Sequence, residues 1–224
     1  MKERPILFSG PMVRALLAGT KTQTRRVMKP QPQPNGMWVK SLNNFTCLID
    51  EYPPDATIWR GGILGGDIHA EDYCPYGVVG DRLWVRESFM LVGGGDPGIP
   101  LYRANWREDA RARGLENIPT DEPKGWTPSI HMPRWAARII LEVTDVRVER
   151  LNDISEEDAM AEGIEWNPNL DPCGPCKWRH YMKPNTGVYP APASFESLWD
   201  SINGKGSWDA NPWVWAVTFK RVTQ

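Results

Sequence analysis

This 224-residue chain lacks a large net charge of either sign, and it has few cysteines. The net charge is −2 and there are four cysteines. A balance so near zero argues against a protein that binds nucleic acid mainly by neutralising phosphates. It leaves open a small base, a nucleoside or a single strand that is bound by stacking on aromatic side chains.

Long apolar runs are also missing, so the sequence predicts no membrane span and no membrane partner. The first residues, MKERPILF, lack the pattern of a signal peptide. We therefore expect a cytoplasmic protein. Its four cysteines are then expected to be reduced or bound to metal rather than paired in disulfides.

Tryptophan, glycine and proline are plentiful. Twelve Trp are present, and a Trp side chain suits a pocket wall or a stacking platform as well as a core. The 20 Gly and 21 Pro predict many turns and long loops. No repeat and no linker divides the chain, so we expect one domain over residues 1–224. The sequence leaves its oligomeric state open.

The stretch MVRALLAGTKTQTRR, Met12 to Arg26, combines a helix with a reactive-looking corner. Pro11 fits a first helical turn, and Gly19 predicts a left-handed C-cap. A threonine-rich strand follows over residues 20–27. If the backbone is still turning at Lys21, this lysine and Thr24 can meet.

Other elements follow from hydrophobic periodicity and turn signals. A change of phase near Thr144 and Asp145 predicts a bulge in the longest strand. Ser155 and Ser194 are the predicted N-caps of two later helices. The predicted strands cover 5–8, 82–89, 138–150 and 213–222, a short helix is possible over 106–113, and residues 29–76, 93–133 and 166–192 are predicted to be rich in loops.

GTKTQTRR, residues 19–26, resembles the G-x-K-x-x-[ET]-x-R motif of ASCH domains. Three further pieces match that family in order, namely GDRLWV at 80–85, the strand at 138–150 and SEEDAMAEG at 155–163, and the strand at 213–222 completes the skeleton. The whole chain resembles a subgroup from phages and prophages, through CPYGVVGDRLWVRE, PSIHMPRWAARI and SINGKGSWDANPWVW.

The resemblance implies an α+β protein with a PUA-like small β-barrel, short flanking helices and long loop-rich insertions. The implied core covers about 4–28, 78–90, 136–164 and 194–222, and the insertions cover about 29–77, 91–135 and 165–193.

One branch of this superfamily, the N4-acetylcytidine amidohydrolases, uses a Lys, a Thr and a Glu. The resemblance places them at Lys21, Thr24 and Glu162. It implies a hydrolase that deacylates an N4-acylcytidine-like amide in a modified nucleobase or nucleoside, with no cofactor required for the chemistry. This chain departs from the branch in being considerably longer.

Two mechanisms are compatible with these three residues. A base such as Lys21 can activate the Thr24 hydroxyl as a nucleophile. Alternatively Lys21 and Glu162 activate water while Thr24 positions it. The plain structural alternative is an ordinary ion pair between strand and helix.

Further substrate-binding candidates are Arg26, which can stabilise an oxyanion, and Arg86, Glu87 and Trp84 on the strand near residue 85. For Arg86 and Glu87 a salt bridge is the structural alternative. Weaker candidates are His131 and the stacking residues Trp135, Trp213 and Trp215.

Cys173 and Cys176 stand in a C-x2-C pair that is followed by His180, an arrangement that resembles half of a zinc knuckle. Cys74 is the candidate fourth ligand. A structural zinc at these four residues would join two insertions, and free thiols are the alternative.

Two other functions stay open. One is a non-catalytic module that binds RNA, single-stranded nucleic acid or a modified base, as many PUA-like barrels do. The other is a ribonuclease activity, which also occurs among ASCH-like proteins.

Overall fold

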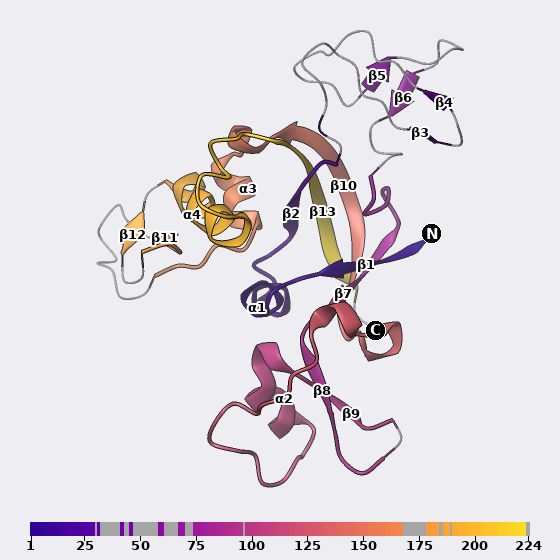
Figure 1. The fold of residues 1–224 in the computed structure, drawn as a ribbon, viewed down its shortest axis with the longest axis vertical. Helices are drawn as coiled ribbons and strands as arrows, with labels where there is room; N and C mark the ends of the chain where they lie inside the picture. The colour runs from indigo at the N-terminus through magenta and orange to yellow at the C-terminus, as the bar shows by residue number, and fades with distance from the viewer. Residues whose placement is uncertain are drawn as a thin grey trace.

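The computed structural model of the chain is shown in Figure 1. The residues that it describes are 1–29, 31, 41–42, 45–46, 58–60, 67–69, 74–95, 97–167, 178–183, 186–188 and 190–222.

A five-stranded sheet forms the centre of the fold, in the order β1-β7-β10-β13-β2. The strands β1 and β7 are parallel, and every other neighbouring pair is antiparallel. The bounds are Glu3–Leu7 for β1, Gln23–Val27 for β2, Arg82–Arg86 for β7, Ile140–Arg150 for β10 and Trp213–Val222 for β13.

The predicted bulge in the longest strand is confirmed. The register of β10 against β13 shifts between Val143 and Asp145, where the burial phase of β10 also changes. One extra residue bends a strand and increases its twist. Figure 1 shows β10 and β13 as a pair of long curved ribbons.

The α+β class is confirmed, but the pairing in the described residues is open rather than the closed barrel that was predicted. The strands β1 and β2 lie at the two edges of the sheet. No backbone ladder joins these two strands within the described residues. A side chain links them instead: Nη2 of Arg26 on β2 donates to the carbonyl of Leu7 on β1 at 2.7 Å.

The helix α1 (Gly10–Ala18) ends as predicted, with Gly19 in the left-handed region at φ 76°. The helix α3 (Glu156–Ala161) begins at Ser155, whose hydroxyl accepts from the Asp158 amide at 3.1 Å. The predicted start of the last helix is wrong. The helix α4 runs over Ala191–Asn203, and the Ser194 hydroxyl donates to the carbonyl of Arg179 instead of capping.

The predicted loop-rich segments contain short elements of their own. The helix α2 (Trp106–Ala112) confirms the short helix expected there, and it follows an unexpected hairpin of β8 (Phe89–Val92) and β9 (Ile99–Tyr102). The remaining pairs are β3 (Ser41–Leu42) with β4 (Phe45–Thr46), β5 (Ile58–Arg60) with β6 (Asp67–His69), and β11 (Trp178–Arg179) with β12 (Gly187–Val188). The described residues also include the 3-10 turns η2 (Arg103–Asn105), η3 (Ser129–His131), η4 (Arg134–Ala136) and η5 (Leu151–Asp153).

The main hydrophobic core joins the inner face of the sheet to helices α1, α3 and α4. Leu83 and Val85 of β7 are fully buried on this face, whereas Trp84 and Arg86, which alternate with them along the strand, are half-buried on the other. In Figure 1 the helices α3 and α4 lie beside β2, while β8, β9 and α2 lie at the lower end of the molecule. No helix within the described ranges is both long enough and apolar enough to cross a membrane.

Candidate active site

Lys21 and Glu162 meet although 141 residues separate them in the chain. Gly19 ends helix α1 and turns the chain back, and Gly163 ends α3 in the left-handed region at φ 79°. A Cβ atom on Gly163 would lie 2.9 Å from Cβ of Lys21 and 3.0 Å from Cβ of Ala15. The missing side chain therefore lets the end of α3 approach the first residues after α1 closely.

The Lys21 ammonium is enclosed by acceptors. Its Nζ donates to Oε2 of Glu162 at 2.8 Å, to the Glu162 carbonyl at 2.8 Å and to the Gln23 carbonyl at 2.7 Å. The residue is only 4 % exposed. Burial lowers the pKa of Lys21 below its usual value, the charges of Arg26 and Arg25 lower it further, and Glu162 opposes them.

Arg25 holds the other oxygen of Glu162. Its Nη1 lies 3.3 Å from Glu162 Oε1, and its Nη2 contacts Glu149 and lies 2.8 Å from Asp158 Oδ2. Burial raises the pKa of Asp158, but Arg25, Arg147 and the hydrogen bond from Gln23 together outweigh that effect, and the pKa lies below its usual value. The two oxygens of Glu162 are thus divided between a lysine and an arginine.

Thr24 faces the same small cavity as the Lys21–Glu162 pair. The cavity has a volume of about 160 Å³ and is also lined by Arg25 and Arg26. No hydrogen bond to the Thr24 hydroxyl forms within the described part of the chain, although the residue is 4 % exposed. Apolar walls are supplied by Leu7, Phe8, Met12, Val27, Phe195, Leu198, Trp199 and Ile202.

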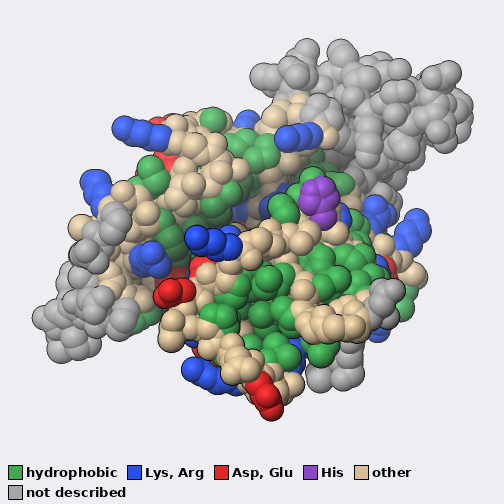
Figure 2. Space-filling model, turned by 60° about the horizontal axis from the view of Figure 1, so that its bottom comes forward, with side chains coloured by type: hydrophobic (Ala, Val, Ile, Leu, Met, Phe, Trp, Pro, Cys, Tyr) green, Lys and Arg blue, Asp and Glu red, His purple; other side chains and the backbone are tan. Residues whose placement is uncertain are grey.

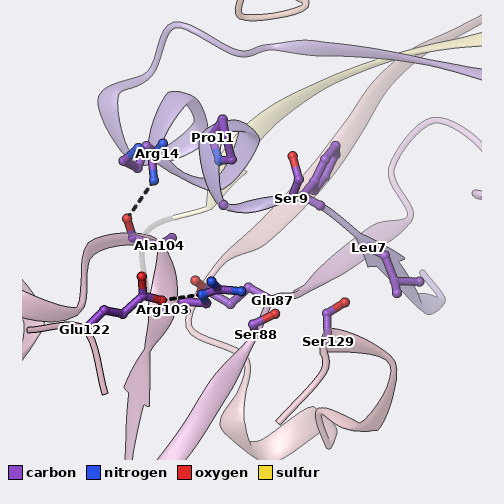
Figure 3. Close-up of a pocket in the computed structure, with 12 residues that line it drawn as sticks. Leu7, Ser9, Pro11, Arg14, Glu87, Ser88, Arg103, Ala104, Glu122 and Ser129 are labelled. Carbon is purple, nitrogen blue, oxygen red and sulfur yellow. Dashed lines mark hydrogen bonds and ion pairs between the residues drawn. The ribbon is translucent and has the colours of Figure 1, made fainter. Parts of the chain in front are cut away.

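Phe8 lines both this cavity and a larger neighbour. Nζ of Lys21 and the Arg26 guanidinium lie 5.5 and 5.2 Å from the centre of the Phe8 ring. Leu7, Phe8 and Ser9 line both cavities. The larger one has a volume of about 610 Å³ and lies between α1 and residues 87–129 (Figure 3).

Glu87 was predicted to bind substrate in the pocket of Lys21, but it lines the larger cavity and not the one around Lys21. Nε and Nη2 of Arg138 donate to Oε1 and Oε2 of Glu87, at 2.8 and 2.9 Å. The salt bridge that was the structural alternative is therefore present. Glu87 is 2 % exposed. Burial raises the pKa of Glu87, and Arg138 opposes that effect.

Trp84 and Arg86 lie on the other face of β7 and line neither of these two cavities. Arg86 lies 5.2 Å from the centre of the Trp84 ring. Its guanidinium donates to the carbonyls of Met132 and Ile130, which fastens the loop around His131 to the sheet. The structure therefore places Trp84 and Arg86 away from the cavity of Lys21, Thr24 and Glu162. Arg26 does line that cavity.

The weaker aromatic candidates are dispersed. Trp135 is 55 % exposed, Trp213 carries the Arg150 guanidinium 4.4 Å from its ring centre, and Trp215 is buried in the main core. None of the three lines the cavity around Lys21.

The zinc prediction falls partly outside the described residues, which exclude Cys173 and Cys176. Cys74 is buried in the main core. Nδ1 of His180 accepts from the Met182 amide at 3.2 Å, which leaves Nε2 as its nitrogen for a metal. The structural zinc stays a prediction.

Several residues of the site escaped sequence reasoning. Asp158 and Glu149 surround Arg25, and Phe195 and Trp199 reach the cavity from α4, far along the chain. The acidic side chain at position 158 looked like an ordinary first-turn residue of a helix. Only its spacing of four residues from Glu162, on one helical face, could have pointed to it.

Comparison with protein-family models, with curated proteins and with solved structures finds no match to this chain.

Proposed function

We propose that the chain is an ASCH-type protein of the PUA-like class and a hydrolase. Its substrate in this proposal is an N4-acylated cytosine-like base, and the bond cleaved is the exocyclic amide. One observation carries the proposal: a buried Lys21–Glu162 pair and Thr24 line a single cavity. The order of the sequence motifs supports it.

Amide hydrolysis needs a nucleophile, a proton shuttle and stabilisation of the oxyanion. In the first route a neutral Lys21 takes the hydroxyl proton as Thr24 Oγ attacks the carbonyl carbon. The tetrahedral intermediate then expels the base, whose amine nitrogen receives that proton, and leaves an acyl ester on Thr24. Water hydrolyses the ester, releases the carboxylic acid and restores the hydroxyl.

The second route uses water directly. Lys21 and Glu162 remove a proton from a water molecule, which adds to the carbonyl carbon, and the same proton is returned to the leaving amine. Thr24 then only holds the water or the carbonyl. In both routes Arg26 is the cation available to the oxyanion, since it lines the cavity beside Phe8.

The lowered pKa of Lys21 supports either route. A lysine with its ordinary pKa would be fully protonated at neutral pH and unable to accept a proton. Burial and the two neighbouring arginines favour the neutral form. A buried lysine perturbed in this way beside a cavity is typical of a functional site.

The test is release of free acid from a panel of N4-acylated cytosines and cytidines. We expect turnover by the unaltered protein and a loss of at least about a hundredfold in kcat/KM for Lys21→Ala and for Glu162→Ala. Lys29→Ala, an exposed lysine nearby in the chain, is the matched control. No turnover across the panel, or full activity in both variants, would refute the proposal.

A second candidate is binding without chemistry, in which the cavity holds a flipped base. The aromatic walls Phe8 and Trp199 favour it, because base stacking on aromatic rings is tolerant of sequence. Figure 2 shows Lys and Arg side chains scattered singly over one face of the molecule, with no continuous basic stripe. Binding of single-stranded RNA or DNA at low salt, without turnover, would decide for this candidate.

A further inference from the structure

We propose that the larger cavity is a sugar subsite, which takes an uncharged, hydroxyl-rich group such as the ribose attached to a base in the smaller cavity. This inference rests on the proposed function for the identity of the base. It assigns a role to residues of the 91–135 segment, which lies outside the family-like skeleton.

The sizes of the two cavities and their adjacency support a shared ligand. Ligand pockets commonly have volumes of about 300–1,000 Å³. The cavity around Lys21 is smaller, at about 160 Å³, whereas its neighbour has about 610 Å³. Leu7, Phe8 and Ser9 line both, so the two cavities are adjacent, and in this proposal the group attached to a base in the small cavity passes Phe8 to reach the large one.

The charge of the larger cavity favours a neutral group. Two guanidinium groups, from Arg14 and Arg103, face two carboxylates, from Glu87 and Glu122. Their formal charges cancel. A phosphate is usually recognised by a surplus of arginine or lysine. This lining has no such surplus.

The polar groups suit hydroxyls. Within the described residues, the hydroxyls of Ser9, Ser88 and Ser129 form no hydrogen bond with the protein. Each hydroxyl can donate once and accept twice, as a sugar hydroxyl requires. In Figure 3, Ser9 and Arg14 lie on the α1 side of the cavity, and Ser88 and Ser129 lie on the opposite side.

Glu122 is the carboxylate best able to accept from a sugar diol. Both oxygens of Glu87 are hydrogen-bonded to Arg138. Within the described residues Glu122 has one partner, Nε of Arg103, which lies 2.6 Å from its Oε1. The Arg103–Glu122 pair is about half exposed on both sides. The second carboxylate oxygen of Glu122 is available to a ligand, and carboxylates commonly bind ribose hydroxyls in this way.

The experiment uses cytosine, cytidine and cytidine 5′-monophosphate, none of which carries an amide that can be cleaved. Binding to the full chain is measured by calorimetry. We expect cytidine to bind about tenfold more tightly than cytosine, which corresponds to roughly two added hydrogen bonds. We expect the monophosphate to bind no more tightly than cytidine.

Two variants locate the effect. Glu122→Ala and Ser88→Ala are expected to reduce the preference for cytidine over cytosine severalfold and to leave the affinity for cytosine unchanged. The matched control is Glu116→Ala, an exposed glutamate of the same segment that does not line the cavity. It is expected to keep the full preference.

Equal affinity for cytosine and cytidine would overturn the inference, as would a preference that survives in both variants, or no binding of either ligand. Tighter binding of the monophosphate would replace the sugar subsite with a phosphate site. The hydrolase proposal is tested separately, by measuring acid release from acylated bases, because that reaction does not require a sugar. A preference for cytidine without any turnover would leave the subsite standing and remove the chemistry.

Discussion

Nζ of Lys21 lies 2.8 Å from Oε2 of Glu162, and the opposite oxygen of the same carboxylate lies 3.3 Å from Nη1 of Arg25. Both oxygens of Glu162 are therefore paired with cations. Lys21 is enclosed and lies next to two further positive charges, and burial lowers its pKa below the usual lysine value.

The role of Thr24 can be tested by changing its hydroxyl alone. Thr24→Val keeps the shape of the side chain and removes the hydroxyl, and Thr24→Ser keeps the hydroxyl. If Thr24 Oγ is the nucleophile, we expect kcat/KM for an N4-acylated base to fall by about 10²-fold or more in the valine variant and by less than about tenfold in the serine variant. A valine variant with near-normal kcat would show that water attacks directly.

The pH dependence of activity tests Lys21 as the base. Only the neutral amine accepts a proton, so kcat/KM is expected to rise with pH along one limb whose midpoint lies below the ordinary lysine pKa. Arg26→Gln removes a charge that lowers the pKa of Lys21, so the limb should move to higher pH. Arg107→Gln, exposed on α2, should leave it in place. A shift toward lower pH in Arg26→Gln would contradict the assignment.

Gly163 should tolerate no side chain. In Gly163→Ala the new Cβ would press on Lys21 and Ala15 and also occupy a strained φ, so we expect a loss of roughly 2–4 kcal/mol in the free energy of unfolding. Gly114→Ala is the matched control, with φ 67° and no atom within 4 Å of its Cβ position. It should cost only about 1 kcal/mol. Urea unfolding of both variants measures the difference, and equal losses would mean that the contact is not tight.

The pair of Arg138 with Glu87 offers a second test of burial. Arg138→Met would leave Glu87 buried without its two hydrogen bonds, at an expected cost of about 3–5 kcal/mol. Arg134→Met breaks a comparable two-bond pair with Glu3 that is well exposed, and should cost about 0–1 kcal/mol. Chemical unfolding midpoints compare them. Similar midpoints for the two variants would show that water reaches Glu87.

Local elements could be predicted from the sequence because their signals are local. The bulge after Val143 follows from a change of hydrophobic phase, and the start of α3 follows from a serine three residues before an acid. The start of α4 was missed because Pro190 and the alanines after it carry no side-chain cap, whereas Ser194 looked like one. The hairpin of β8 and β9 was missed because its short strands, FMLV and IPLY, do not alternate between apolar and polar residues, and the glycines between them indicate a loop.

The site itself was predictable only in part. Lys21 and Thr24 are only three residues apart in the sequence, so their nearness could be predicted. The position of Glu162 was predicted from the family resemblance and not from any periodicity. Nothing local says that Arg25 points into a cluster of three carboxylates, or that α4 supplies one wall of the cavity. Such contacts depend on how distant elements pack, which the hydrophobic pattern does not encode.

The place of β2 at the edge of the sheet has a consequence for the growing chain. Within the sheet β2 has one partner, β13, and Thr24 pairs there with Val217. During synthesis from the N-terminus, residues 21–27 cannot pair within the sheet until residues 213–222 have left the ribosome. The candidate active site is thus among the last parts of the fold to assemble, and a shortened translation product would carry all three of its residues without the strand that holds them.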